Sequence, residues 1–156
     1  MCSSDLFVLS TYRLTEHHTA GGMSRTVPYL AELQPEFFCE LSPELAAERG
    51  LEHGGWATIV TARQAIEGRV MVTSRIQPLE VQGRSMHVVG APYHWGSVGI
   101  VTGDSANELL SVTLDNNVHI SEYKVATCDI RPGRRPRGRA RLELVESYRR
   151  RAGVKA

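Results

Sequence analysis

The chain lacks the features that identify several large classes of protein. Its 156 residues contain no apolar run near the length of about 18 that a transmembrane helix needs, so we expect no membrane insertion. The N-terminus has no basic region followed by an apolar stretch, so no secretory signal is visible. The three cysteines, Cys2, Cys39 and Cys128, lie far apart and predict neither paired metal ligands nor a disulfide framework. We expect Cys39 and Cys128 to be buried thiols.

Basic residues are scarce in most of the chain and concentrated at its C-terminal end. The formal net charge is +1, but residues 131–156 hold ten Arg or Lys against two Asp or Glu, which leaves the first 130 residues with eight basic and fifteen acidic residues. The acidic body is not expected to bind nucleic acid. For the basic tail, nucleic-acid binding and docking on an acidic protein surface both stay open. Residues 131–141 have no interleaved aromatic residue, which favours an arginine-rich strap over an acidic subunit surface.

Short strands dominate the pattern of the chain, with few helical segments. The clearest helix starts at Ser42 as the N-cap with Pro43 at its first position, and Gly50 ends it. Many short strands and one clear helix predict a mostly β (α+β) barrel with small helices. The expected strands are residues 6–9, 36–41, 56–61, 67–73 (a hairpin with 56–61), 79–81, 86–89 and 124–130, and the expected helical segments or turns are residues 28–33, 43–49, 107–114 and 142–151.

The most unusual segment is residues 11–25, which follow the buried-strand pattern of residues 6–9. Hydroxyls, two adjacent imidazoles, two arginines and a glycine pair occur there within fifteen positions. A protein core does not select that mixture, whereas a strand end that holds a large, polar, anionic ligand does, because it supplies donors and close backbone approach. Arg13 stands where the strand ends, and its guanidinium offers a planar fork to phosphate or carbonyl oxygens.

A metal site at His17 and His18 is the less favoured interpretation of the same segment. Adjacent residues of an extended segment face opposite ways, and no further ligand stands at a workable spacing. For Ser24 and Arg25, a role in capping or in a turn is at least as well supported as ligand contact.

Four blocks of the sequence together resemble one known family. They are residues 11–25, then Gln34-Pro35-Glu36-Phe37 leading into residues 42–50, then Pro92-Tyr93-His94-Trp95-Gly96, and finally Asn107-Glu108-Leu109 with Glu122-Tyr123-Lys124. In this order the blocks resemble the C-terminal, molybdopterin-dinucleotide-binding domain of formate dehydrogenase catalytic (alpha or major) subunits, in the dimethyl sulfoxide reductase superfamily. The resemblance covers residues 6–130 and implies a six-stranded double-psi β-barrel with short flanking helices. The basic Pro/Arg-rich tail, residues 131–156, then follows with a short C-terminal helix.

The resemblance also implies a cofactor and a parent enzyme. The cofactor is molybdopterin guanine dinucleotide, whose dithiolene sulfurs hold molybdenum or tungsten in a complete enzyme that oxidises formate to carbon dioxide. The family's metal-ligating selenocysteine or cysteine, catalytic histidine and arginine, and iron–sulfur cysteines belong to upstream domains. We therefore expect no catalytic or metal-ligating residue here, and no activity of this chain alone. The implied partners are the upstream domains of the catalytic subunit and an iron–sulfur subunit, and both a cytoplasmic and a periplasmic location stay open.

The resemblance and the residue chemistry together give the expected cofactor contacts. By resemblance, His17 matches a histidine that hydrogen-bonds the pterin close to the metal and tunes its redox behaviour. Asn107 suits the edge of a pterin or guanine, and Lys124 supplies charge for phosphate or a pterin carbonyl. Ser121 stands where the family usually has proline, which loosens the expected turn before Tyr123. The expected cofactor-binding residues are Thr11, Arg13, Leu14, Thr15, His17, Thr19, Tyr93, Asn107, Tyr123 and Lys124.

Weaker signals concern three other features of the chain. Trp95 is expected either to contact the ligand or to close the end of the barrel as an aromatic plug. A stand-alone hydrolase or decarboxylase on a similar barrel requires a nucleophile and a base, and no such pair is identifiable. Residues 1–5 are expected to be a leader foreign to the domain, because residues 2–6 are what a common sequencing-adapter stretch encodes. The natural chain is then expected to extend upstream.

Overall fold

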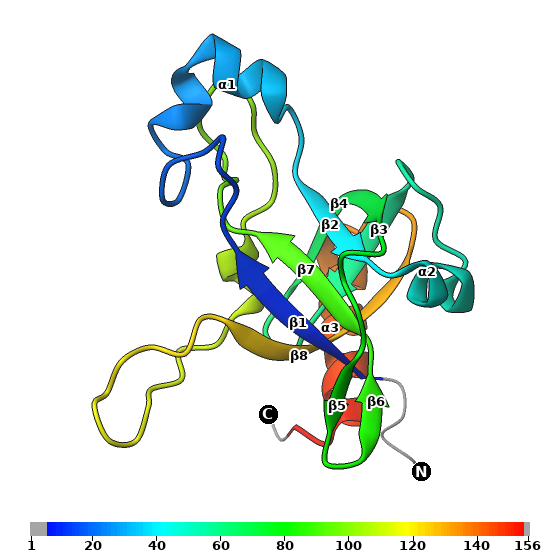
Figure 1. Ribbon diagram of the computed structural model, residues 1–156. Coiled ribbons are helices and arrows are strands. Elements are labelled where there is room, and N and C mark those ends of the chain that lie inside the picture. The colour runs from blue at the N-terminus through cyan, green and yellow to red at the C-terminus, as the bar shows by residue number, and fades with distance from the viewer. Residues whose placement is uncertain (1–5, 155–156) are drawn as a thin grey trace.

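A computed structural model of the chain describes residues 6–154 (Figure 1). The expected foreign leader, residues 1–5, lies outside the described residues. None of the described helices has the length and apolar character to cross a membrane. Six strands close into a barrel in the order β1-β7-β2-β4-β3-β8. These strands are β1 (Phe7–Tyr12), β2 (Phe38–Leu41), β3 (Trp56–Val60), β4 (Ala65–Val72), β7 (Val88–Pro92) and β8 (Val125–Pro132).

Two parallel strand pairs define the topology of the barrel. β1 runs parallel to β7, and β2 runs parallel to β4, whereas the other neighbouring strands are antiparallel. Parallel neighbours need a long connection, and in both pairs other barrel strands lie between the partners in sequence. The closed mixed barrel confirms the predicted six-stranded double-psi β-barrel, and the antiparallel β3–β4 pair confirms the predicted hairpin.

The barrel interior is filled by alternate side chains of its strands. In β1, Phe7, Leu9 and Thr11 are buried and the residues between them are partly exposed. Cys39 and Cys128 are fully buried free thiols, as predicted. Burial raises the pKa of Cys39 to about 12, so this thiol stays protonated in the core.

Two of the helices follow their predicted signals closely. α1 (Pro28–Leu33) and α2 (Pro43–Arg49) both begin with proline. The hydroxyl of Ser42 accepts a hydrogen bond from the Leu45 backbone at 3.2 Å, and Gly50 ends α2 in the left-handed conformation at φ +63°. Figure 1 shows α1 held outside the barrel, together with the short 3-10 helix η1 (Ser24–Thr26), by the segments that connect β1 to β2.

The prediction of one strand over residues 86–89 is wrong. Met86 ends β6 (Arg84–Met86), which pairs only with β5 (Leu79–Val81) in a hairpin outside the barrel. Val88 begins β7, which lies buried between β1 and β2. Met86 at the end of β6 and Val88 at the start of β7 are both apolar and only His87 separates them, so the pattern of residues 86–89 does not mark the boundary.

The C-terminal helix, α3 (Gly138–Ala152), is longer than the predicted segment 142–151 and packs on the barrel. Its N-terminus has no capping side chain, so the sequence carries no start signal there. Val145 and Tyr148 are buried against Val60 and Ala65. The tail therefore adds a second small core to the domain.

Candidate functional site

The ends of several elements meet at one end of the barrel. Because β1 and β7 are parallel, their C-terminal ends lie together, and β8, antiparallel to β1, begins beside them. The Tyr93 N–H donates to the Tyr12 carbonyl at 2.9 Å, and the Thr11 N–H donates to the Lys124 carbonyl at 3.0 Å. The resulting hollow of about 440 Å³, which we call the Asn107 hollow, is lined by Arg13, Arg63, Tyr93, Asn107, Leu110, Val112, Tyr123 and Lys124.

The Asn107 hollow is cationic. Arg13 and Lys124 contribute positive charge, and no carboxylate occurs among its lining residues. The Arg13 guanidinium lies 6.0 Å from the centre of the Tyr93 ring. Burial and the neighbouring Tyr123 raise the pKa of Tyr93, although Arg13 acts in the opposite direction. The Tyr93 phenol therefore stays protonated and can donate a hydrogen bond to a ligand.

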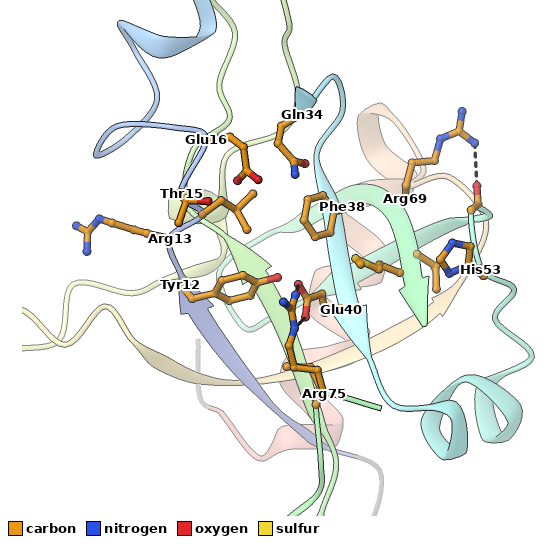
Figure 2. A pocket seen from close by; sticks show the side chains of 15 residues that line it. Tyr12, Arg13, Thr15, Glu16, Gln34, Phe38, Glu40, His53, Arg69 and Arg75 are labelled. Atoms are coloured by element: carbon orange, nitrogen blue, oxygen red, sulfur yellow. Dashed lines mark hydrogen bonds and ion pairs between the residues drawn. The ribbon is translucent and has the colours of Figure 1, made fainter. Parts of the chain in front are cut away.

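Arg13 also lines a second hollow, of about 760 Å³, which we call the Glu40 hollow (Figure 2). Its charge is mixed, since Glu16 and Glu40 face it. Glu40 is almost fully buried and accepts a hydrogen bond from Arg75 Nε at 3.2 Å. Burial and the Glu40 carboxylate together raise the pKa of Tyr12. Further lining residues of the Glu40 hollow are Leu14, Thr15, Gln34 and Phe38.

The polar loop after β1 is fastened by two buried side chains. His94 Nε2 accepts a hydrogen bond from the Leu14 N–H at 2.6 Å, which leaves Nδ1 to donate to the Thr19 carbonyl at 2.5 Å. Burial lowers the pKa of His94, in keeping with a neutral ring in this role. Arg25 is also buried, and it donates to the carbonyls of His94 and, at 2.9 Å, Val98. Both side chains hold the loop backbone in place.

The structure brings most of the predicted cofactor contacts to the two hollows. Thr11 lines neither: it is buried, and its hydroxyl donates to the Tyr123 carbonyl at 2.5 Å, which fixes the start of β8. Three predicted residues line the Glu40 hollow, namely Arg13, Leu14 and Thr15. Five line the Asn107 hollow, namely Arg13, Tyr93, Asn107, Tyr123 and Lys124.

His17 and Thr19 also lie off the two hollows. His17 is 4% exposed, and its Nδ1 lies 3.0 Å from the Ser24 hydroxyl oxygen. Its ring packs edge-on against Trp95, with 5.2 Å between the ring centres. Trp95 is itself buried and belongs to the main hydrophobic core. Thr19 is exposed at a positive φ of 45° in the loop.

Arg63 and His94 are the residues whose contribution sequence reasoning missed. Arg63 lines the Asn107 hollow and donates to the Leu110 carbonyl at 2.7 Å, although the sequence places it only in the turn between β3 and β4. Closure of the barrel alone brings that turn to the hollow, so no local pattern could reveal it. For His94, the available signal was its place inside one of the four family-like blocks.

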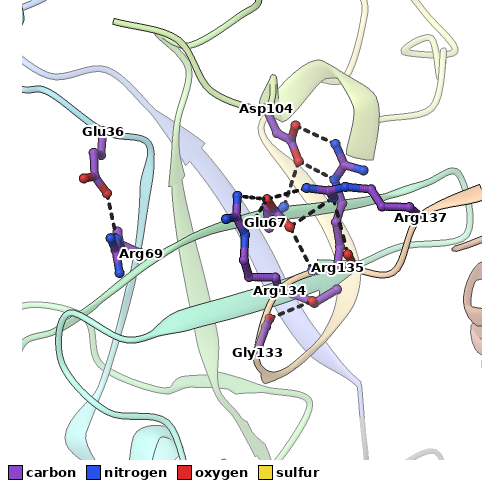
Figure 3. A network of polar contacts seen from close by, with 9 residues as sticks. Glu36, Glu67, Arg69, Asp104, Gly133, Arg134, Arg135 and Arg137 are labelled. Carbon is purple, nitrogen blue, oxygen red and sulfur yellow. Dashed lines mark hydrogen bonds and ion pairs between the residues drawn. The ribbon is translucent and has the colours of Figure 1, made fainter.

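The basic tail folds back on its own barrel. The sequence favours an arginine-rich strap over an acidic subunit surface, and in the structure Arg134 and Arg137 pair with Glu67 of β4 in the same chain (Figure 3). Arg134 and Arg137 donate to the Glu67 carboxylate at 2.7 and 2.8 Å, and the Arg135 N–H does so at 2.9 Å. Burial acts to raise the pKa of Glu67, but these hydrogen bonds outweigh it and lower the pKa to about 2. Arg134, Arg135 and Arg137 are thus paired with carboxylates of the same chain.

Fold and site together define the class of protein. A cationic hollow at one end of a double-psi barrel suits a phosphate-bearing organic cofactor. Residues 6–154 contain no group of three or more His, Cys, Asp or Glu side chains placed to hold a metal ion. The protein is accordingly a cofactor-binding β-barrel domain. More particularly, the chain belongs to the molydopterin dinucleotide binding domain family, which it matches over residues 7–127.

Relatives of known name agree with this family. The chain is 41% identical over 124 residues to formate dehydrogenase 2 subunit alpha (cytochrome c-553) of Nitratidesulfovibrio vulgaris, covering 80% of this chain and 12% of that protein. It is 41% identical over 119 residues to the formate dehydrogenase subunit alpha of Megalodesulfovibrio gigas, covering 76% of this chain and 12% of that protein. It is 39% identical over 125 residues to the nitrate-inducible formate dehydrogenase major subunit of Escherichia coli, covering 80% of this chain and 12% of that protein. The resemblance described from the sequence is therefore confirmed.

Among solved structures, acetylene hydratase from Pelobacter acetylenicus has a similar fold. The TM-score is 0.61 at 14% identity, over 81% of this chain and 18% of that one. At this identity the likeness shows the fold alone. The chain spans about 12% of the length of the formate dehydrogenase subunits that it matches.

Proposed function

We propose that this chain holds part of a molybdopterin guanine dinucleotide in the Asn107 hollow, as the C-terminal domain of a molybdenum or tungsten formate dehydrogenase. The observation that carries the proposal is the convergence of Arg13, Tyr93, Asn107, Tyr123 and Lys124 on that hollow from four separate parts of the chain. A volume of about 440 Å³ suits a portion of this large cofactor, because drug-sized ligands occupy pockets of roughly 300–1,000 Å³.

The chemistry of the lining residues fits the groups of the dinucleotide. Arg13 and Lys124 can neutralise the pyrophosphate, with Arg13 offering two parallel donors to its oxygens. Asn107 carries both a donor and an acceptor for the edge of guanine or pterin. Tyr93 can donate its phenolic hydrogen or stack on a ring. The absence of carboxylates from the lining favours an anionic ligand.

The Glu40 hollow offers the cofactor a second surface that includes Thr15, whereas the Arg13 guanidinium points away from it (Figure 2). Glu16 and Gln34 at its rim (Figure 2) can accept from the amines of a reduced pterin. A direct hydrogen bond from His17 to the pterin requires its ring to leave Ser24 and turn out of the loop. We assign His17 this outward-turned position when the cofactor is bound, because the resemblance matches His17 to a histidine that hydrogen-bonds the pterin.

In the complete enzyme, the bound cofactor supplies two-electron redox chemistry, and the residues of this chain hold and orient it. The relatives are named as alpha or major subunits of formate dehydrogenases, which supports formate oxidation to carbon dioxide as the activity of the whole protein. The catalytic and metal-ligating residues are assigned to upstream domains, so this chain alone has no activity. An iron–sulfur subunit is the proposed further partner.

An exposed apolar arm beside the hollow supports contact with those upstream domains. The arm comprises residues 111–124, which extend from the barrel before β8 (Figure 1). Val112, Val118 and Ile120 on this arm are 75%, 64% and 68% exposed. Clustered exposed apolar side chains are typical of interaction surfaces. We assign the arm to burial against the upstream domains of the catalytic subunit.

The proposal is tested by replacing Arg13 with alanine and measuring cofactor binding. The chain is dialysed anaerobically against molybdopterin guanine dinucleotide released from a molybdenum enzyme. Loss of a charged hydrogen-bonding group should weaken binding about tenfold to a hundredfold. Arg139→Ala, which removes an exposed arginine of α3, serves as the control and should bind like the unaltered chain. Equal binding by Arg13→Ala would contradict the proposal, as would the lack of formate oxidation when the upstream domains are supplied in trans.

A further inference from the structure

The arginine-rich strap, which we define as residues 133–137, lies C-terminal to residues 7–127 and so outside the match to the family. The strap runs across β4 and reaches the loop before the 3-10 helix η2 (Ala106–Leu109) (Figure 3). Gly133 continues the pairing of β8 with β3, since its N–H donates to the Trp56 carbonyl at 2.8 Å. The strap is therefore held in register with the barrel at its start.

Arg135 joins the strap to Asp104 in a bidentate ion pair. Its Nε and Nη2 donate to the two carboxylate oxygens of Asp104 at 2.6 and 2.8 Å. Both side chains are largely buried, at 14% and 17% exposure. One of these oxygens also accepts from the Glu67 N–H at 2.9 Å. Arg135 thus supplies two of the three hydrogen bonds that hold Asp104.

Asp104 anchors the N-terminal side of η2, and residues of the barrel anchor its C-terminal end. Asn107 lies three residues after Asp104, within η2. At the other end, the Thr61 hydroxyl donates to the Leu109 carbonyl at 2.8 Å, and Arg63 donates to the Leu110 carbonyl at 2.7 Å. Ala106 and Leu109 are buried beneath the helix and Asn107 is exposed toward its hollow. Asp104 adjoins the Ser105 N-cap, whose hydroxyl accepts from the Asn107 N–H at 3.3 Å, and together the two anchors hold the backbone that carries Asn107.

We propose that Arg135 is a positioning residue for the cofactor site, which sets the place of Asn107 through the ion pair with Asp104. This inference rests on the proposed function in so far as Asn107 binds the dinucleotide. Thr61 and Arg63 fix the C-terminal end of η2 to the segment between β3 and β4. The strap fixes the N-terminal side of η2 through Asp104. Arg134 and Arg137 support the arrangement by holding Glu67, whose N–H is the third donor to Asp104.

The first test needs no cofactor. Arg135→Gln removes the ion pair, and Arg139→Gln makes the same chemical change at an exposed position of the same tail. Hydrogen exchange of the backbone amides of residues 105–110 should accelerate about tenfold or more in Arg135→Gln and stay unchanged in Arg139→Gln. Arg135→Lys keeps one charged contact to Asp104 and should restore part of the protection. Unchanged exchange in Arg135→Gln, with an unchanged melting temperature, would overturn the anchoring.

The second test measures coupling between the two residues in cofactor binding. Arg135→Gln should weaken binding of the released dinucleotide several-fold, but should have little further effect when Asn107 is already alanine, because the two act as one unit. Arg135→Gln that binds as tightly as the unaltered chain, or whose effect adds in full to that of Asn107→Ala, overturns the inference and leaves the proposed function standing. An unaltered chain that does not bind at all overturns the proposed function, while the exchange test still decides the anchoring.

Discussion

At the scale of single residues, many polar side chains of the site serve the protein backbone. His94 and Arg25 satisfy carbonyl and amide groups of the loop after β1, and Thr11 holds the carbonyl of Tyr123. These bonds fix the loop before any ligand arrives. Arg13 and Asn107 are left on the rim of the hollow, where a bound cofactor would meet a preorganised set of donors.

Glu67 offers a test at this scale because its pKa is strongly lowered. Glu67→Gln should reduce the free energy of unfolding at pH 7 by about 1–3 kcal/mol, since a buried carboxylate that accepts from two arginines is lost. The folded pKa of about 2 lies below the ordinary value of 4.5. The contribution of Glu67 is therefore complete above about pH 4.5 and disappears as the pH falls toward 2.

Urea unfolding of both proteins between pH 7 and pH 2.5 measures this difference. The difference in the free energy of unfolding between Glu67→Gln and the unaltered chain should decrease steadily below pH 4.5. Glu36→Gln is the matched control, because Glu36 also pairs with an arginine, Arg69, but its side chain is 53% exposed. This substitution should lower the free energy of unfolding by well under about 1 kcal/mol. A gap of constant size across this range would show that the charge of Glu67 contributes nothing to stability.

At the scale of elements, local signals predict some segments and cannot predict others. α2 is predictable because Ser42 and Gly50 mark its ends. The start of α3 is not predictable, because it has no capping side chain. The junction of β6 and β7 is not predictable either, because only His87 separates the apolar Met86 and Val88. In both cases the boundary is set by packing against elements distant in sequence.

The packing of α3 gives the test at the element scale. Tyr148 is fully buried and donates to the Thr127 hydroxyl at 3.1 Å. Tyr148→Ala should lower the free energy of unfolding by about 3–5 kcal/mol through the cavity that it leaves. Tyr148→Phe removes only the hydrogen bond and should cost about 1 kcal/mol. If thermal and urea unfolding of Tyr148→Ala match those of the unaltered chain, α3 is not part of the folded domain.

At the scale of the whole molecule, closure of the barrel assembles the site from segments far apart in sequence. Thr11 and Tyr123 are 112 positions apart and share a hydrogen bond. Arg13 could be predicted from its place at a strand end, and Asn107 and Lys124 from the resemblance to a family. The place of Arg63, and the pairing of Glu67 with the strap, could not be predicted, because nothing local in the sequence records which distant partner a charge meets.

The most direct test of the account is a map of where the cofactor binds. The ¹⁵N-labelled chain is titrated anaerobically with released molybdopterin guanine dinucleotide, and backbone and side-chain amide shifts are followed by nuclear magnetic resonance. We expect the largest shifts at residues 13, 93, 107, 123 and 124, including the Asn107 side-chain amide. Shifts confined to the arginines of α3, or no saturable shifts at all, would contradict the claim that the Asn107 hollow holds the dinucleotide.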